Sequence, residues 1–80
     1  MNQPKVVMIG LGYIGLPTAA LIAQNKTYVH GVDINPNVVD TINAGKIHIV
    51  EPELDNAVAN AVKEGYLKAS TTPVEANTYL

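Results

Sequence analysis

The sequence VVMIGLGYIGLP at residues 6–17 decides the fold of this 80-residue chain. It opens with a short apolar run that contains β-branched residues, which predicts a buried strand over residues 5–9. The next residues have the spacing G-x-G-x-x-G and lead to a proline suited to the first turn of a helix. The stretch therefore predicts a strand, a tight glycine-rich turn and a helix in succession. The three glycines of the turn are Gly10, Gly12 and Gly15.

Each glycine of this turn has its own expected role in binding a dinucleotide. Gly10 permits the tight turn out of the strand, and Gly12 lets a pyrophosphate lie against a backbone that has no Cβ atom. Gly15 allows the helix to pack closely on the strand. The N-terminus of the helix then offers free N–H groups and a partial positive charge to the pyrophosphate. Similar turns also occur for purely structural reasons and in sites for FAD or S-adenosylmethionine. The motif therefore indicates dinucleotide binding only together with the strand before it, the helix after it and an acidic residue further along the chain.

Asp33 is the second part of the predicted dinucleotide site. It follows another apolar run, which predicts a strand over residues 28–32, and it lies 18 residues after Gly15. A carboxylate at the end of this strand can accept hydrogen bonds from the adenosine ribose, and it repels a 2′-phosphate. The chain has no arginine that could hold such a phosphate. We therefore expect NAD as the cofactor, in preference to NADP.

Two further helices are expected in the middle of the chain. Asn35 and Pro36 predict the start of one, which ends near Gly45, because asparagine caps helices and proline suits their first position. The other is expected to begin at Glu51 and to end at Gly65. Its apolar residues recur at spacings of three and four, as on the buried face of a helix. They are Leu54, Ala57, Val58, Ala61 and Val62.

The C-terminal part predicts a third strand over residues 66–70. Thr72, with Glu75 three residues later, predicts a capping box and a short helical turn, and residues 78–80 resemble the approach to a missing fourth strand. The alternation predicts the α/β class, as an incomplete Rossmann-type doubly wound parallel sheet with three strands and crossover helices. The strand at residues 5–9 would then be an open sheet edge, which favours edge pairing or aggregation.

Composition excludes several other classes of protein. The chain has no cysteine, so it can form no disulfide and offers no thiol nucleophile. Its two histidines, His30 and His48, are far apart in the sequence, so we expect no metal site. The net charge of −2 argues against nucleic-acid binding. The uncharged run over residues 6–23 resembles a membrane span or a signal peptide, but its glycines and Pro17 would interrupt an apolar helix. We expect a globular domain, with His30 as a core or edge histidine and His48 in solvent.

The sequence around the motif resembles the N-terminus of the UDP-glucose/GDP-mannose dehydrogenase family, the nucleotide-sugar 6-dehydrogenases. The resemblance rests on residues 7–17, where a tyrosine and a proline accompany the glycines, and on residues 31–35. Residues 40–54 and 69–73 look most like the UDP-N-acetyl-D-mannosamine branch. In particular, the chain has VEPEL where the UDP-glucose branch more often has YEPGL. The similarity extends over residues 5–80.

The resemblance implies that residues 1–80 are the N-terminal part of the NAD-binding Rossmann domain of a larger enzyme. The family oxidises the 6-hydroxyl of a nucleotide sugar to a carboxylate in two steps and consumes two NAD. A cysteine carries the covalent intermediates, a lysine and an asparagine stabilise the oxyanions, and an aspartate assists the water. All four would lie beyond Leu80, so the chain holds no catalytic and no metal-binding residue. The cofactor-binding residues that carry over are Gly10, Leu11, Gly12, Tyr13, Ile14, Gly15, Asp33 and Ile34.

For the full-length enzyme, the resemblance implies NAD, a UDP-sugar substrate, a homo-oligomer and a cytoplasmic location, with neither nucleic acid nor membrane as a partner. The isolated chain is expected to bind NAD weakly and to oxidise nothing. Other interpretations are a UDP-glucose-type dehydrogenase, a non-catalytic NAD-sensing module like those of potassium transporters, and a 3-hydroxyacid or 6-phosphogluconate dehydrogenase. The last is disfavoured by Ile14 and by the pair Leu16 and Pro17.

Overall fold

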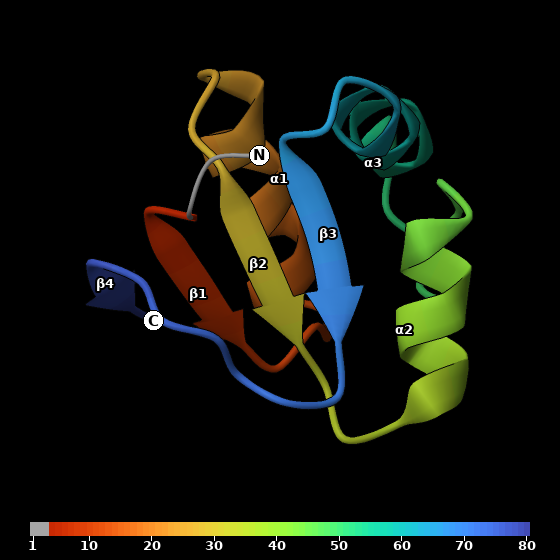
Figure 1. Cartoon of the computed structure of the whole chain (residues 1–80). Helices are drawn as coiled ribbons and strands as arrows, with labels where there is room; N and C mark the ends of the chain where they lie inside the picture. Colours follow the sequence, from red (N-terminus) through yellow and green to blue (C-terminus); the bar gives the residue numbers. More distant parts are fainter. Residues whose placement is uncertain (1–3) are drawn as a thin grey trace.

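The structure, a computed structural model, describes residues 4–80 as a four-stranded parallel sheet with three helices (Figure 1). The strands are β1 (Val6–Ile9), β2 (Val29–Val32), β3 (Leu67–Ser70) and β4 (Thr78–Tyr79). The helices are α1 (Gly15–Gln24), α2 (Pro36–Asn43) and α3 (Leu54–Lys63). Their spatial order, β3-β2-β1-β4, confirms the doubly wound α/β class. The part of the domain expected over residues 1–80 includes residues 1–3, which lie outside the described residues.

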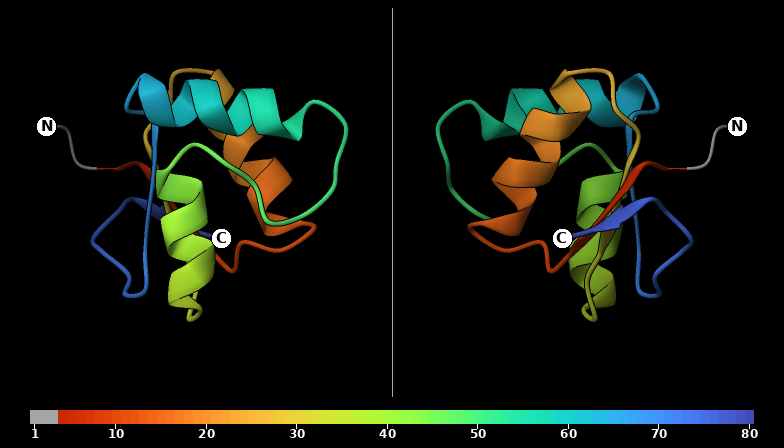
Figure 2. Two further views of the ribbon diagram at one scale, coloured as in Figure 1. Left: turned by 90° about the vertical axis from the view of Figure 1, so that its right-hand side faces the viewer. Right: turned by 90° about the vertical axis from the view of Figure 1, so that its left-hand side faces the viewer.

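Helices α1 and α3 pack on the side of the sheet that holds the main core. Figure 1 shows α1 behind the strands and α2 beside the outer edge of β3, and the side views of Figure 2 show α1 on one side of the sheet. The small residues of α1 let its axis approach the strands. The buried residues of this helix are Leu16, Ala19, Ala20 and Ala23. They meet Met8 and Val29 of the sheet and Leu54, Val58 and Ala61 of α3.

Local signals place most helix ends where they are expected. The Asn35 side chain caps α2, because its Oδ1 accepts a hydrogen bond from the backbone N–H of Asn37 at 2.9 Å. Gly45 and Gly65 follow α2 and α3 with positive φ angles of 77° and 83°. The expected start of α3 at Glu51 is wrong. A turn precedes the helix, which begins at Leu54.

The side chain of Asn43, the last residue of α2, covers the outer edge of the sheet. Its Nδ2 donates to the carbonyl oxygen of Ala69 at 2.9 Å, and its Oδ1 accepts from the Ala69 N–H at 2.8 Å. Ala69 lies in β3, so the amide takes the place that a neighbouring strand would have. The contact satisfies backbone groups that an edge strand otherwise leaves open to another chain.

The helical turn expected after Thr72 is wrong. Residues 71–77 contain no helix, and the hydroxyl of Tyr79 holds this segment in another conformation. It donates to the carbonyl oxygen of Val74 at 2.8 Å and accepts from the N–H of Ala76 at 3.2 Å. The carbonyl oxygen of Thr72 accepts from the Ser70 hydroxyl at 2.6 Å. The expected capping box therefore does not form, because contacts with β3 and β4 replace it.

The expectation of three strands with β1 at an open edge is also wrong. Thr78 and Tyr79 form β4, which pairs in parallel with Val6 and Val7. The pairing continues beyond β4, since the Leu80 N–H donates to Val7 at 2.7 Å and Leu80 accepts from the N–H of Ile9 at 2.8 Å. β1 is therefore an interior strand, and the argument for aggregation through its edge no longer holds.

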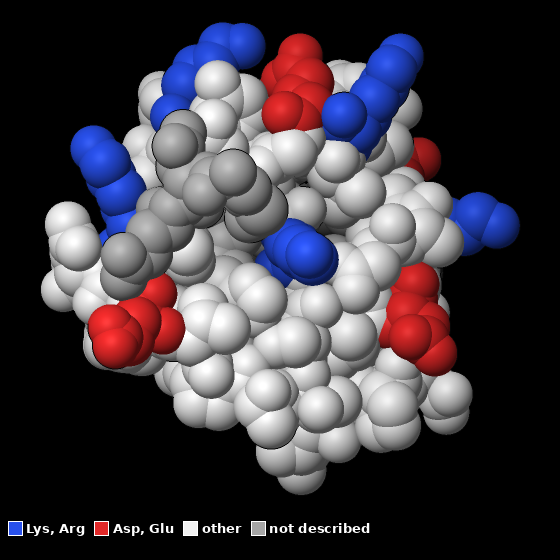
Figure 3. Space-filling model, in the orientation of Figure 1, with Lys and Arg blue, Asp and Glu red and all other residues white. Residues whose placement is uncertain are grey.

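The face of the sheet opposite α1 carries no helix among residues 4–80, and Figure 3 shows it with few charged side chains. His30 lies on this face of β2 and is 8% exposed, with its Nε2 at 2.6 Å from the Ser70 hydroxyl. Because that hydroxyl donates to Thr72, its oxygen accepts from the imidazole N–H. His30 is thus the satisfied core histidine that the sequence predicts. Burial lowers its pKa, and the charge of Lys68 lowers it further.

We expect the fold to lose stability as the pH falls below about 6.5, the ordinary pKa of histidine. In this window the unfolded chain binds a proton more readily than the folded chain, because the pKa of His30 is lowered by folding, so protonation favours unfolding. The His30→Gln variant keeps an N–H donor for Ser70 but takes up no proton. Its urea midpoint should depend less on pH between about 5 and 6.5 than that of the wild type. Equal slopes in the two proteins would assign the effect to another group.

Candidate functional site

The glycine-rich turn joins the end of β1 to the start of α1. Gly10 leaves the strand with a φ of 88° and donates its N–H to the Val32 carbonyl oxygen at 2.7 Å. At Gly15 the helix runs so close to this turn that a Cβ atom would overlap the Gly10 carbonyl oxygen. The structural roles predicted for Gly10 and Gly15 are therefore confirmed.

Gly12 lies at the open side of this turn. A Cβ atom built there would have no atom within 4 Å, so the space beside its backbone is free. Within the described part of the chain, the N–H groups of Gly12, Tyr13 and Ile14 donate to no protein acceptor. They stand at the N-terminus of α1, where the helix dipole favours an anion. This arrangement could hold a phosphate or pyrophosphate through backbone groups alone.

Asp33 follows β2 directly, and its carboxylate faces the glycine-rich turn. Its Oδ2 accepts from the Leu11 N–H at 3.1 Å, and its Oδ1 accepts from the Asn35 N–H at 3.0 Å. Both hydrogen bonds lower the pKa of Asp33, and the bond from Asn35 has the larger effect. Partial burial raises this pKa, and the charge of His48 lowers it by a smaller amount. The carboxylate is therefore ionised at neutral pH, and its remaining lone pairs could accept hydroxyl groups.

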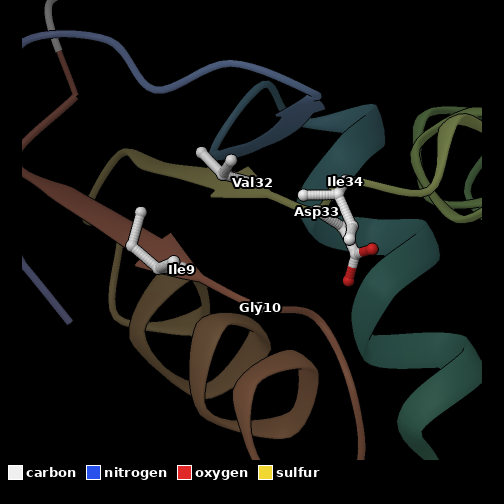
Figure 4. Close-up of a pocket in the computed structure, with 5 residues that line it drawn as sticks. All are labelled: Ile9, Gly10, Val32, Asp33 and Ile34. Atoms are coloured by element: carbon white, nitrogen blue, oxygen red, sulfur yellow. The ribbon is translucent and has the colours of Figure 1, made fainter.

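A pocket of about 170 Å³ lies beyond the carboxyl ends of β1 and β2 (Figure 4). Its walls are mainly apolar, and Ile34 at its rim is 92% exposed. Ligands of open parallel sheets bind outside the carboxyl ends of the strands, where this pocket lies. A flat apolar ring and an adjoining ribose would fit between these walls and the carboxylate. The lining residues are Ile9, Gly10, Val32, Asp33 and Ile34.

The structure brings the eight sequence-predicted residues to one end of the sheet, but their side chains differ in role. The Leu11 side chain is fully buried, so only its backbone could face a ligand. Tyr13 and Ile14 are 65% and 84% exposed and point into solvent. Sequence reasoning named Ile34 but missed the other apolar walls, Ile9 and Val32, and it also missed Gly31, against which Leu11 packs. The signal for Gly31 was its place inside a predicted strand, where glycine often marks a close approach.

These residues fit a dinucleotide that carries a free ribose 2′-hydroxyl. The backbone beside Gly12 has the space that a pyrophosphate needs, and the ionised Asp33 offers hydroxyl acceptors near it. A 2′-phosphate would meet the Asp33 carboxylate without a nearby arginine to balance the charge. The geometry therefore suits NAD better than NADP.

Within residues 4–80, no group of three or more His, Cys, Asp or Glu side chains is placed to hold a metal ion. None of the helices formed by these residues is both long enough and apolar enough to cross a bilayer. The uncharged run over residues 6–23 instead forms β1, the glycine-rich turn and most of α1.

The sequence matches a profile of the UDP-glucose/GDP-mannose dehydrogenase family, NAD binding domain, over residues 4–78. It is 63% identical over 81 aligned residues to a UDP-N-acetyl-D-mannosamine dehydrogenase of Campylobacter jejuni and 59% identical over 80 residues to one of Escherichia coli K12. Both alignments cover 100% of this chain but only 20% and 19% of the relatives. The chain thus spans about a fifth of the length of these relatives.

Solved structures agree with this assignment. The UDP-N-acetyl-mannosamine dehydrogenase of Staphylococcus aureus superposes with a TM-score of 0.90 at 41% identity, over 94% of this chain and 18% of that one. The GDP-mannose dehydrogenase of Pseudomonas aeruginosa superposes with a TM-score of 0.82 at 34% identity, over 84% and 15%. Together with the glycine-rich turn and the carboxylate of Asp33, these similarities show that the chain belongs to the NAD-binding domain of the UDP-glucose/GDP-mannose dehydrogenase family.

Proposed function

We propose that this chain supplies the adenosine and pyrophosphate half of the NAD site of a UDP-N-acetyl-D-mannosamine 6-dehydrogenase. The observation that carries the proposal is the open backbone at Gly12 beside the ionised carboxylate of Asp33. The choice of sugar is supported by relatives that are 55–63% identical and are named UDP-N-acetyl-D-mannosamine dehydrogenases.

In this proposal each part of the site has a defined task. The N–H groups of Gly12, Tyr13 and Ile14 bind the pyrophosphate, and Asp33 accepts the adenosine ribose hydroxyls. Ile34 and the pocket walls cover the adenine. When bound, NAD supplies the acceptor for a hydride from the sugar, while the residues of this chain only bind and orient it.

We assign residues 1–80 to the N-terminal part of the NAD-binding domain and expect the catalytic groups to come from other segments. The chain has no cysteine, so the thiol nucleophile that the family resemblance implies cannot come from it. The proposal includes a UDP-sugar substrate, a homo-oligomer and a cytoplasmic location for the whole enzyme. The 80-residue chain alone should bind NAD weakly and turn over no nucleotide sugar.

Asp33→Asn should reduce the preference for NAD over NADP. In the wild type the Asp33 carboxylate repels the 2′-phosphate, so NADP should bind at least about 10-fold more weakly than NAD. The variant removes this repulsion and one hydroxyl acceptor, so NAD binding weakens while the ratio of the two dissociation constants falls toward one. NMR titration of the chain with each cofactor measures both constants.

Asp40→Asn is the matched control for this experiment. Asp40 is exposed on α2, so this change removes the same charge without touching the site. It should leave the NAD to NADP ratio as in the wild type. An unchanged ratio in Asp33→Asn, or equal binding of both cofactors by the wild type, would refute the role given to Asp33.

A chimera tests the proposed activity directly. Residues 1–80 of this chain would replace the equivalent segment of the Campylobacter jejuni UDP-N-acetyl-D-mannosamine dehydrogenase, to which it is 63% identical. We expect the chimera to oxidise UDP-N-acetyl-D-mannosamine with NAD, because the segment would rebuild the cofactor site. The assay follows NADH absorbance with saturating sugar.

The chimera with Gly12→Val is the control, since it should fold but lose NAD-dependent turnover. A folded chimera that binds NAD yet remains inactive would show that this segment does not fit a dehydrogenase of that branch. A folded chimera that does not bind NAD would refute the cofactor site itself.

A further inference from the structure

Gly31 lies inside β2, directly beneath the side chain of Leu11. A Cβ atom at Gly31 would lie 2.8 Å from Cδ2 and 2.9 Å from Cδ1 of Leu11, closer than real Cβ contacts allow. Leu11 is fully buried, so its side chain has no solvent-exposed space into which it could move freely. The absent side chain of Gly31 therefore makes the space that Leu11 fills.

Two backbone contacts join the same segments. The Gly10 N–H donates to the Val32 carbonyl oxygen at 2.7 Å, and the Leu11 N–H donates to Asp33 at 3.1 Å. With the packing of Leu11 on Gly31, the last two residues of β2 and Asp33, which follows them, hold the first half of the glycine-rich turn. The turn is thus fixed by the strand that ends at the ribose-binding carboxylate.

We infer that Gly31 and Leu11 are positioning residues of the dinucleotide site, because their contact sets the place of the Gly12 backbone relative to Asp33. The inference rests on the proposed function and deepens it. The pyrophosphate and the adenosine ribose belong to one ligand with a short, fixed connection between them. A cofactor that binds at both points depends on their separation, although neither Gly31 nor Leu11 offers it a side-chain contact.

A methyl group at Gly31 would force Leu11 away from β2. The turn would move with it, the hydrogen bond from the Leu11 N–H to Asp33 would lengthen, and Gly12 would leave its place. Shortening Leu11 to alanine removes Cγ, Cδ1 and Cδ2, the three atoms that the added methyl group would meet. Leu11→Ala should therefore restore NAD binding in a chain that carries Gly31→Ala. If each substitution only destabilised the fold, their separate effects would instead add up in the double variant.

The test is an NMR titration of the 80-residue chain with NAD, in the wild type, Gly31→Ala, Leu11→Ala and the double variant. We expect Gly31→Ala to raise the dissociation constant at least about 10-fold, and the double variant to recover most of that loss. Amide hydrogen exchange of Leu11 without ligand is the second measurement. Gly31→Ala should remove its protection, because the acceptor at Asp33 is then out of reach.

Gly65→Ala is the control for stability. Gly65 has a φ of 83° and free space around its Cβ position, so alanine there strains the backbone before β3 without touching the site. It should lower the melting temperature and keep the wild-type affinity for NAD.

Three outcomes would overturn the inference: wild-type affinity in folded Gly31→Ala, a double variant that binds no better than Gly31→Ala, or a Leu11 amide that keeps its protection. If Gly31→Ala does not fold, the inference requires that the double variant fold and bind NAD about as tightly as Leu11→Ala. A wild-type chain that binds no NAD would refute the proposed function instead, and the Leu11 exchange measurement would still decide whether Gly31 positions the turn.

Discussion

Gly15→Ala is expected to lower the free energy of unfolding by about 3 kcal/mol or more, at the upper end of what overpacking costs. The added Cβ atom would overlap the Gly10 carbonyl oxygen and lie 3.0 Å from its carbon. These are backbone atoms, so no side-chain rotation can relieve the overlap, and α1 must move away from β1. Since α1 contributes much of the core, its displacement affects the whole fold. Urea unfolding followed by circular dichroism measures the loss.

Gly12→Ala is the matched control, because it adds the same methyl group three residues earlier in the same turn. No atom lies within 4 Å of the new position, and the backbone there needs no positive φ. Its stability should stay within about 0.5 kcal/mol of the wild type. Equal losses in the two variants would contradict the close approach of α1 to Gly10.

Gly12→Val should abolish most NAD binding while the chain remains folded. The branched side chain would occupy the space beside the N–H groups of residues 12–14, where the pyrophosphate is proposed to lie. Losing two hydrogen bonds to a charged group, at about 1.5–3 kcal/mol each, would raise the dissociation constant at least about 100-fold. NMR titration measures the affinity, and the amide spectrum of the free variant reports its fold.

Gly12→Ala provides the intermediate step in this series. Its smaller side chain should weaken NAD binding less than valine does, with little change in melting temperature in either variant. If both variants kept wild-type affinity, the pyrophosphate would not lie against this turn. If both lost stability in proportion to affinity, Gly12 would act through the fold alone.

Gly12 and Gly15 show how the spacing of glycines in a motif can predict a separate role for each of them. Gly12 and Gly15 both belong to the dinucleotide motif, yet the space beside Gly12 is open, as the proposed pyrophosphate site needs, whereas Gly15 keeps space for a backbone. The sequence predicts both roles because the motif lies between a strand and a helix whose ends are set by local residues. The helix cap at Asn35 and the glycine-led helix ends at Gly45 and Gly65 are local in the same way.

The errors of prediction lie where distant contacts decide the structure. Thr72 and Glu75 have the spacing of a capping box, but the hydroxyl of Tyr79 holds this segment outside a helix. β4 has only two residues, too few for a hydrophobic pattern, and it forms through pairing with Val6 and Val7. The local sequence preferences of a short segment cannot predict such contacts, because they depend on residues elsewhere in the chain.

By itself, the sequence determined the α/β class, the dinucleotide motif, NAD as the cofactor and the absence of cysteine from this chain. Each depends on residue type and on spacing within one strand, turn or helix, and these are short-range properties. Only the tertiary structure decided that β1 is an interior strand, that Asp33 holds the Leu11 N–H, and that Gly31 makes room for the Leu11 side chain. The last two depend on a distance between segments about 20 residues apart, which the packing of β2 against the turn sets.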